Sequence, residues 1–141
     1  MLFRSDSARF TVAYTKIGVS PDGGSTWMLP RIVGEKKAME LMLLNPVLKA
    51  EEALQLGLIS RIYPEADLLE ESFKVACQLA AGPSLAFGET KRLLADSSVN
   101  SIEHQLELET RAIAGLARYS EDTKEGIGSF IEKRAPEFRG E

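Results

Sequence analysis

Hydrophobic residues recur at helical spacing over most of the chain. The spacing predicts helices over residues 27–33, 35–44, 51–56, 67–80, 85–95, 102–116 and 120–134. Extended structure is expected at two places, an apolar run at residues 8–17 and a short alternating run at residues 58–63. The pattern therefore predicts a helix-rich α/β chain with one or two strands, and it shows no clear partner for the first strand.

A turn rich in glycine and proline, residues 17–27, separates the first predicted strand from the first predicted helix. Pro21 fixes one φ angle, while Gly23 and Gly24 permit positive φ and a close approach of the backbone to a ligand. The serine and threonine that follow are expected to cap the helix, so that its positive end lies near Asp22. A carboxylate there suits acid–base chemistry. An ordinary turn with Asp22 as a solvated cap is the alternative, and the turn alone does not decide between them.

The composition limits the classes of partner. The 141 residues suffice for one domain with its own core, and 44% hydrophobic and 27% charged residues are typical of a globular protein. A net charge of −4 without a basic stripe argues against nucleic acid. No apolar run approaches the roughly 20 residues that span a bilayer, and no secretory leader is recognisable. We expect a cytoplasmic protein with neither a nucleic-acid nor a membrane partner.

Cysteine and histidine occur once each, as Cys77 and His104. Cys77 lies in an apolar helical pattern, so we expect a small buried side chain there. His104 falls outside the apolar stripe of its helix, so we expect a surface residue rather than a catalytic base. A lone cysteine excludes an intrachain disulfide, and this pair makes a zinc site hard to assemble. We expect no metal.

The first residues of the chain carry little pattern. Residues 1–7 are short and polar, and residues 2–5 can be encoded by the tail of a common sequencing adapter. We therefore expect a disordered or artefactual start, with the natural gene continuing upstream.

Several motifs recur in an order that points to one family. They are residues 8–10, 16–26, 29–34, 38–41, 50–59 and 125–126, Phe130, and residues 132–134. Together they resemble the crotonase superfamily, the enoyl-CoA hydratases and isomerases, and the motifs are most similar to those of 1,2-epoxyphenylacetyl-CoA isomerase-like members. The resemblance covers residues 7–140, and it corresponds to the second half of the family's domain.

This resemblance implies a fold and a division of the chain. The expected fold is the C-terminal, helix-rich portion of a crotonase-like ββα spiral, of class α/β with few strands. Residues 8–64 would be the end of the core, with the catalytic turn, and residues 65–141 would be a helical oligomerisation region. The backbone N–H groups of the family's oxyanion hole belong to the other half of the domain.

The resemblance also implies the chemistry. Crotonase-like enzymes bind an acyl-CoA thioester and stabilise its enolate, while a carboxylate in an apolar pocket moves protons. The second glutamate of the hydratases aligns with Tyr14, which argues against the hydratase mechanism. Asp22 matches the proton-carrying aspartate of a Pro-Asp-x-Gly-like turn in the family's isomerases. We expect an isomerase with Asp22 as the catalytic residue, and a hydratase is the alternative.

The remaining site residues follow from the same resemblance. The residues expected to contact the acyl group are Tyr14, Pro21, Gly23 and Trp27. Simple core packing equally explains the two aromatic residues. Phe130 and Lys133 match positions that contact the CoA adenine and phosphate from a neighbouring subunit. The implied partners are an acyl-CoA thioester, with coenzyme A as part of the substrate and no separate cofactor, and further copies of the chain in a trimer or hexamer. The competing hypotheses are a non-catalytic truncated fragment or oligomerisation module and, if the motifs are coincidence, an unrelated helical binding module.

Overall fold

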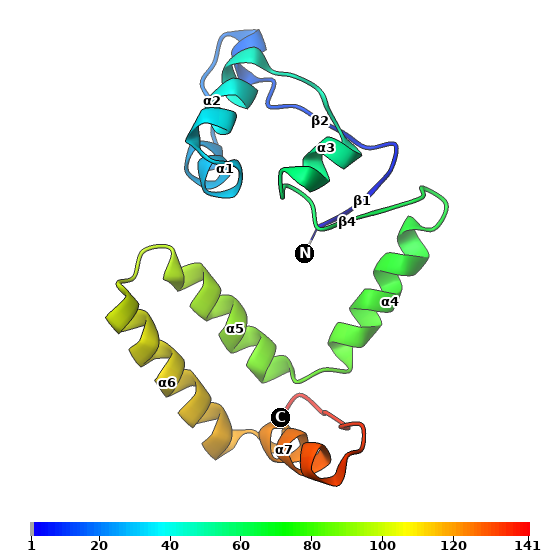
Figure 1. The fold of residues 1–141 in the computed structure, drawn as a ribbon, viewed down its shortest axis with the longest axis vertical. Helices are drawn as coiled ribbons and strands as arrows, with labels where there is room; N and C mark the ends of the chain where they lie inside the picture. Colours follow the sequence, from blue (N-terminus) through cyan, green and yellow to red (C-terminus); the bar gives the residue numbers. More distant parts are fainter. Residues whose placement is uncertain (1) are drawn as a thin grey trace. The chain divides into compact units, whose positions relative to one another are not determined.

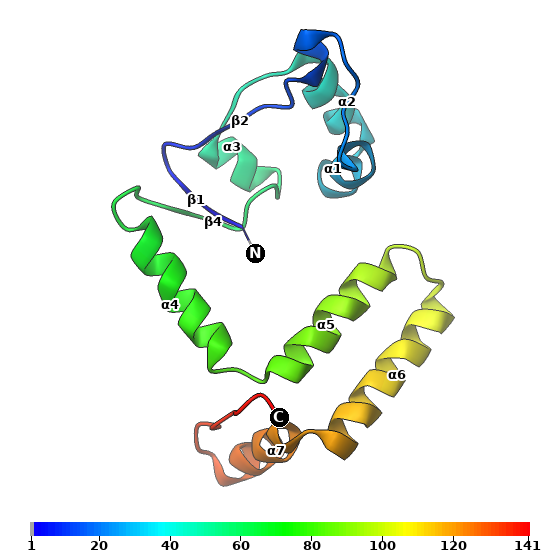
Figure 2. The same ribbon diagram turned by 180° about the vertical axis from the view of Figure 1, so that it is seen from behind.

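A computed structural model describes residues 2–141 (Figures 1 and 2). The chain divides into two compact units, the first extending to Phe73 and the second running from Lys74 to Glu141. The boundary lies within helix α4 (Leu68–Ala80). The first unit contains the short strands and the predicted catalytic turn, and the second is helical.

Four short strands pair in two separate sheets of the first unit. β1 (Phe3–Ser5) runs parallel to β4 (Arg61–Tyr63), and β2 (Arg9–Phe10) runs antiparallel to β3 (Leu48–Lys49). The rings of Phe3 and Tyr63 meet edge to face, with centroids 5.9 Å apart, which stabilises the β1–β4 pair. Residues 3–5 thus form a paired strand, and the expectation of a disordered or artefactual start at residues 1–7 stays a prediction.

The predicted strand at residues 8–17 is wrong over most of its length. Only Arg9–Phe10 is β-structure, and the segment ends in a 3₁₀ helix, η1 (Tyr14–Ile17). Gly18 closes η1 in the left-handed region, with φ of 76° and its N–H donating to the carbonyl of Thr15. The apolar residues of this run thus serve a tight turn as well as a strand, which local alternation does not distinguish.

Three helices complete the first unit: α1 (Ser25–Val33), α2 (Glu35–Leu44) and α3 (Ala50–Gln55). They agree with the predicted helices to within a few residues. The buried apolar side chains are Ala38, Leu41, Ala50, Ala53 and Ile59. Four of these five residues lie on α2 and α3.

The second unit consists of the end of α4 followed by α5 (Ser84–Ser97), α6 (Ile102–Tyr119) and α7 (Glu121–Glu132). α5 and α6 lie side by side as a helical hairpin (Figures 1 and 2). Gln105 is buried between them, where its Nε2 donates to the carbonyl of Leu93 at 3.1 Å. These helices confirm the predicted periodicity.

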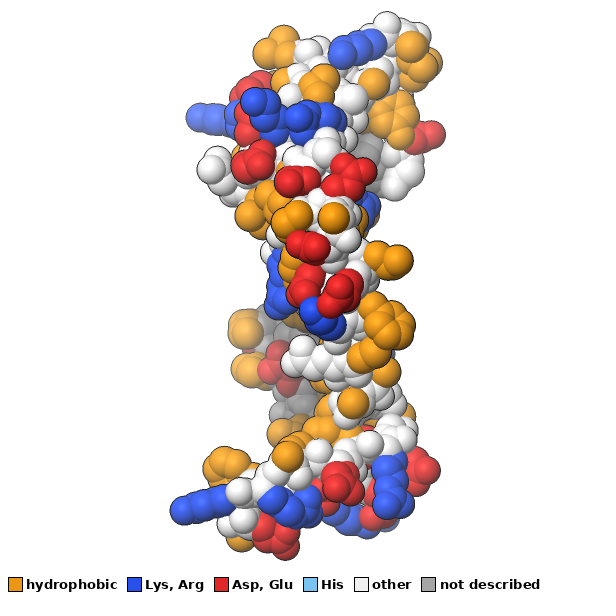
Figure 3. All heavy atoms as spheres, turned by 90° about the vertical axis from the view of Figure 1, so that its right-hand side faces the viewer, with side chains coloured by type: hydrophobic (Ala, Val, Ile, Leu, Met, Phe, Trp, Pro, Cys, Tyr) orange, Lys and Arg blue, Asp and Glu red, His pale blue; other side chains and the backbone are white. Residues whose placement is uncertain are grey.

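Much of the apolar surface of the helices is exposed. On the face shown in Figure 3, hydrophobic side chains lie beside acidic and basic ones. Leu69 and Phe73 of α4 are 83% and 67% exposed. Cys77 is exposed as well, so its predicted burial is wrong: the helical stripe does not show whether a partner covers it. His104 is exposed, as predicted.

Candidate functional site

The predicted catalytic turn presents a tyrosine–aspartate pair. The hydroxyl of Tyr14, at the start of η1, donates a hydrogen bond of 2.7 Å to Oδ1 of Asp22. An ionised carboxylate only accepts hydrogen bonds, so the phenol is the donor. This bond and the negative charge of Asp22 raise the pKa of Tyr14 above its ordinary value of 10.0. Two residues that the sequence analysis assigned to the site therefore meet.

Hydrogen bonds to α2 hold the tyrosine's side of the pair. The hydroxyl of Thr15, the next residue in η1, donates to the carbonyl of Met42 at 2.8 Å. The side chain of Asn45, which is buried, donates to the same hydroxyl at 2.6 Å. The 3₁₀ helix is thereby fixed to the C-terminal end of α2, and the position of Tyr14 is fixed with it.

The aspartate's side of the pair is held by the first turn of α1. The N–H of Ser25 donates to the carbonyl of Asp22 at 3.0 Å, and its hydroxyl donates to the same oxygen at 2.7 Å. The predicted serine or threonine cap is wrong, because Gly24 is the N-cap residue and no side chain caps the helix. Gly23 and Gly24 both have positive φ, 59° and 78°, so the expected glycine conformation is confirmed.

An apolar groove borders the turn on the side of α2. It has a volume of about 250 Å³ and begins beside Asp22, at Pro21. The other lining residues come from η1, α1 and α2, and they are Thr15, Thr26, Pro30, Glu35, Ala38, Met39, Met42 and Leu43. Flexible methionine side chains adapt to ligands of irregular shape. The carboxylate of Asp22 is itself exposed, so the expected enclosure of the acid in an apolar pocket is not formed by the described residues.

Trp27 lies in the first turn of α1 and is 47% exposed. The guanidinium of Arg31 stacks on its ring, 3.7 Å from the centroid. Arg31 also donates to the carbonyl of Trp27 at 2.8 Å, which fixes the stack within the helix. Sequence reasoning missed this arginine, although its spacing of four residues from an aromatic was visible.

Phe130 and Lys133 belong to the second unit. Phe130 is 84% exposed near the end of α7, and Lys133 closes the helix in the left-handed conformation, with φ of 55°. Exposure leaves both residues accessible to a ligand or another chain. Their role in CoA binding stays a prediction.

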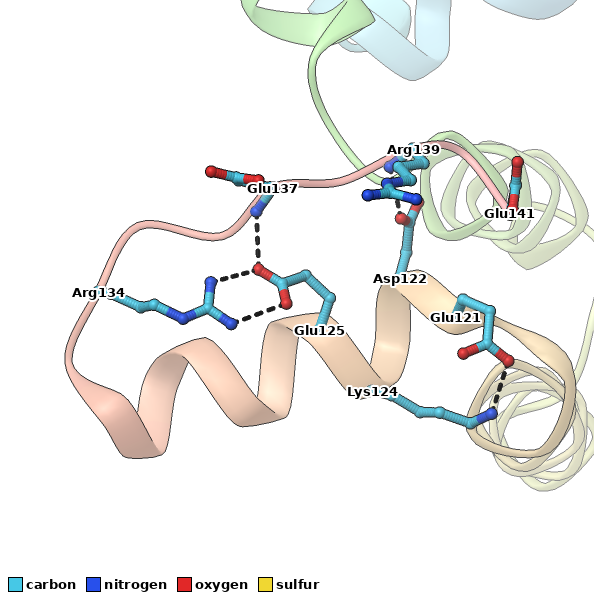
Figure 4. Close-up of a pocket in the computed structure, with 8 residues that line it drawn as sticks. All are labelled: Glu121, Asp122, Lys124, Glu125, Arg134, Glu137, Arg139 and Glu141. Atoms are coloured by element: carbon cyan, nitrogen blue, oxygen red, sulfur yellow. Dashed lines mark hydrogen bonds and ion pairs between the residues drawn. The ribbon is translucent and has the colours of Figure 1, made fainter.

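A second, strongly charged pocket of about 680 Å³ lies between α7 and the C-terminal segment (Figure 4). Arg134 forms a two-pronged ion pair with Glu125, at 2.6 and 2.8 Å, and the N–H of Glu137 donates to the same carboxylate. These contacts lower the pKa of Glu125 to about 2, with the Arg134 hydrogen bonds as the largest cause. All the donors of this carboxylate come from the chain itself, so we interpret the pocket as a structural clamp.

No helix within residues 2–141 is long and apolar enough to cross a membrane. The same residues contain no cluster of three or more histidine, cysteine, aspartate or glutamate side chains placed to hold a metal ion.

The described residues thus combine a glycine-rich turn that presents a carboxylate with a largely helical fold. The chain belongs to the enoyl-CoA hydratase/isomerase family, whose pattern it matches over residues 1–141. The predicted crotonase-like fold is confirmed: subunit I of an enoyl-CoA hydratase from Geobacillus kaustophilus HTA426 superimposes with a TM-score of 0.95 at 32% identity, covering 100% of this chain and 55% of that one. The crystal structure of an enoyl-CoA hydratase from Polaromonas sp. JS666 gives 0.90 at 31% identity, covering 97% and 53%.

The names of the similar curated proteins include an isomerase, hydratases and 4-chlorobenzoyl coenzyme A dehalogenases. The 1,2-epoxyphenylacetyl-CoA isomerase of Escherichia coli (strain K12) is 38% identical over 134 residues, which are 95% of this chain and 51% of that protein. A "probable enoyl-CoA hydratase" of Rhodobacter capsulatus is 40% identical over 140 residues, 99% and 54% of the two chains. The chain spans about half the length of the curated relatives it matches.

Proposed function

We propose that this protein acts on acyl-CoA thioesters as a double-bond or ring-type isomerase, with Asp22 as the carboxylate that carries the proton. One observation carries the choice of isomerase. By resemblance, Tyr14 stands where hydratases have their second glutamate, and its hydroxyl donates to Asp22 at 2.7 Å. The turn therefore presents one carboxylate rather than two, and one carboxylate suffices to take a proton from one carbon and return it to another.

The proposed reaction conserves atoms and electrons. Asp22 removes a proton from the carbon next to the thioester carbonyl, and the electron pair of that C–H bond passes into the enolate. The same proton then returns to a carbon further along the acyl chain, so the double bond moves without a co-reactant. Two backbone N–H groups facing the thioester oxygen would stabilise the enolate. By resemblance, these groups lie in the half of the family's domain that this chain does not span.

The proposal assigns the substrate to two places. The groove beside Pro21 is apolar apart from Glu35 and its threonine hydroxyls, and it suits the acyl group. Phe130 and Lys133 are assigned to the CoA adenine and phosphate of a neighbouring subunit in a trimer or hexamer. The exposed apolar residues at the end of α7, Phe130 and Ile131, support a partner surface there.

Hydration is the second candidate, because several of the similar curated proteins are named as hydratases. It differs from isomerisation in its need for a water molecule and, by resemblance, for two glutamates. A 3-enoyl-CoA that becomes conjugated reports isomerisation, and a 2-enoyl-CoA that loses its conjugation reports hydration. The same absorbance assay thus separates the two activities.

The test compares Asp22→Asn with the wild-type chain on a 3-enoyl-CoA. The amide has nearly the shape of the carboxylate and still accepts the Tyr14 hydrogen bond, but it does not carry the proton. We expect turnover to fall to background while binding of the thioester is retained. Asp96→Asn, which alters an exposed aspartate of α5, is the matched control and should leave turnover unchanged. Turnover of Asp22→Asn at the wild-type rate would refute the assignment, and an inactive wild-type chain would favour the non-catalytic hypothesis.

A further inference from the structure

The Tyr14–Asp22 hydrogen bond makes the two carboxylate oxygens of Asp22 different. Oδ1 accepts the phenol hydroxyl at 2.7 Å. Oδ2 has no hydrogen-bond partner among residues 2–141. The backbone of the turn does not compensate, because Ser25 bonds the carbonyl of Asp22 rather than its side chain. One oxygen is therefore held and the other is open.

We propose that Tyr14 is the positioning residue of the proton-carrying carboxylate: it holds Oδ1, so that the proton is taken up and returned by Oδ2. This inference rests on the proposed function. It assigns Tyr14 a role different from the lining of the acyl pocket, and also different from that of the second glutamate of a hydratase. The phenol keeps its own proton throughout, and the transferred proton travels on Asp22 alone.

The protonation state of Tyr14 fits a positioning role. Only the neutral phenol donates to a carboxylate, whereas the phenolate would repel it. The same bond and the charge of Asp22 raise the pKa of Tyr14, so the donor form persists through the neutral range and beyond the ordinary value of 10.0. A phenol whose pKa is raised is a poorer general acid, which argues against direct proton transfer by Tyr14.

The surrounding structure prevents the pair from drifting apart. Thr15 ties η1 to the carbonyl of Met42, and Ser25 ties the carbonyl of Asp22 to the start of α1. A further hydrogen bond, from the N–H of Val19 to the carbonyl of Tyr14 at 3.3 Å, closes the turn at η1 that carries Tyr14. Both partners therefore sit on anchored backbone, and the hydroxyl selects one orientation of the carboxylate with little further loss of freedom.

The test removes the hydroxyl and keeps the ring. In Tyr14→Phe we expect kcat to fall about tenfold, as for loss of one hydrogen bond to a charged group at an exposed site, with KM within about twofold of the wild type. Tyr119→Phe removes an exposed phenol of α6 and should change neither constant. Replacement of Tyr14 by difluorotyrosine, a more acidic phenol, should restore kcat at neutral pH and move its alkaline loss to lower pH.

A second measurement examines the pair without turnover. The chain has three tyrosines, and absorbance of the phenolates during a pH titration follows all of them. The transition of Tyr14, whose pKa is raised above 10.0, should vanish in Tyr14→Phe and should move toward 10.0 in Asp22→Asn. If the titration of Asp22→Asn matches that of the wild type, the two side chains are not paired and the inference is overturned.

The outcomes separate this inference from the proposed function. An active wild type with an equally active Tyr14→Phe overturns the inference and leaves the isomerase intact. A Tyr14→Phe variant that raises KM without lowering kcat also overturns it, because Tyr14 would then bind the acyl group. An inactive wild type refutes the proposed function, and the inference falls with it whatever the phenol titration shows.

Discussion

Replacement of Asp122 by alanine should release the C-terminal segment from α7. Asp122 is 4% exposed in the first turn of the helix. Its Oδ1 accepts the N–H of Arg139 at 2.7 Å (Figure 4). Its Oδ2 accepts the N–H of Gly140 at 2.8 Å. Its own N–H donates to the carbonyl of Glu141 at 3.1 Å, a bond that alanine retains. The substitution therefore deletes two side-chain contacts and keeps the helix, for which alanine is well suited.

The size of the effect follows from those two bonds. A hydrogen bond to a charged group contributes about 1.5 to 3 kcal/mol. Because one side of the tail is exposed, we expect the two bonds to Asp122 to lie at the lower end of this range. The two bonds together give an expected loss of about 3 kcal/mol in the free energy that docks the tail. Removal of the negative charge near the positive end of α7 adds a smaller loss. Such a change corresponds to about a hundredfold in the equilibrium between docked and released tail.

Amide hydrogen exchange at Arg139 and Gly140 measures that equilibrium directly, because both amides exchange only when the tail is released. We expect their exchange to rise about a hundredfold in Asp122→Ala. Glu121→Ala is the matched control: the same turn loses an exposed ion pair with Lys124, worth at most about 1 kcal/mol. Equal exchange of the two amides in Asp122→Ala and the wild type would show that the carboxylate does not hold the tail.

Two further predictions concern charged groups. The pKa of Glu125 is lowered to about 2, so its carboxylate stabilises the fold fully above the ordinary pKa of 4.5 and loses that contribution as the pH falls toward 2. The difference in denaturation midpoint between wild type and Glu125→Gln should therefore be large at neutral pH and vanish between pH 4.5 and pH 2. A difference that grows on acidification would contradict this sign. Arg31→Ala should alter the fluorescence of Trp27, the sole tryptophan, and lower stability by about 0.5 to 1 kcal/mol, whereas an unchanged spectrum would mean that the stack does not form in solution.

The sequence predicted helices better than strands, for a physical reason. The apolar residues of a helix such as α6 recur at regular spacing, so the pattern that predicts the helix lies within the helix itself. β1 is only three residues long, and it pairs with β4, 58 residues along the chain. No local pattern reports such a pairing, so the sequence did not predict this strand.

The sequence likewise predicted one part of the candidate site and missed another part. Asp22 and Gly23 follow from turn chemistry and motif, and the structure confirms the left-handed backbone that glycine allows. The contact of Tyr14 with Asp22 was not predictable from spacing, because it depends on the 3₁₀ turn that replaced the expected strand. In an extended strand, side chains alternate between the two faces, and nothing would have aimed this phenol at the aspartate.

The isomerase and hydratase names among the relatives can be reconciled through this pair. Most of the chain that matches both relatives consists of helices that support the site. A shared fold does not fix the chemistry of the site that it supports. What separates an isomerase from a hydratase in the proposed mechanisms is how many carboxylates face the substrate. At Tyr14 this chain has a hydroxyl that donates to Asp22 where a glutamate would compete with it for protons. Overall identity to either relative therefore carries less weight for the reaction than the residue at position 14.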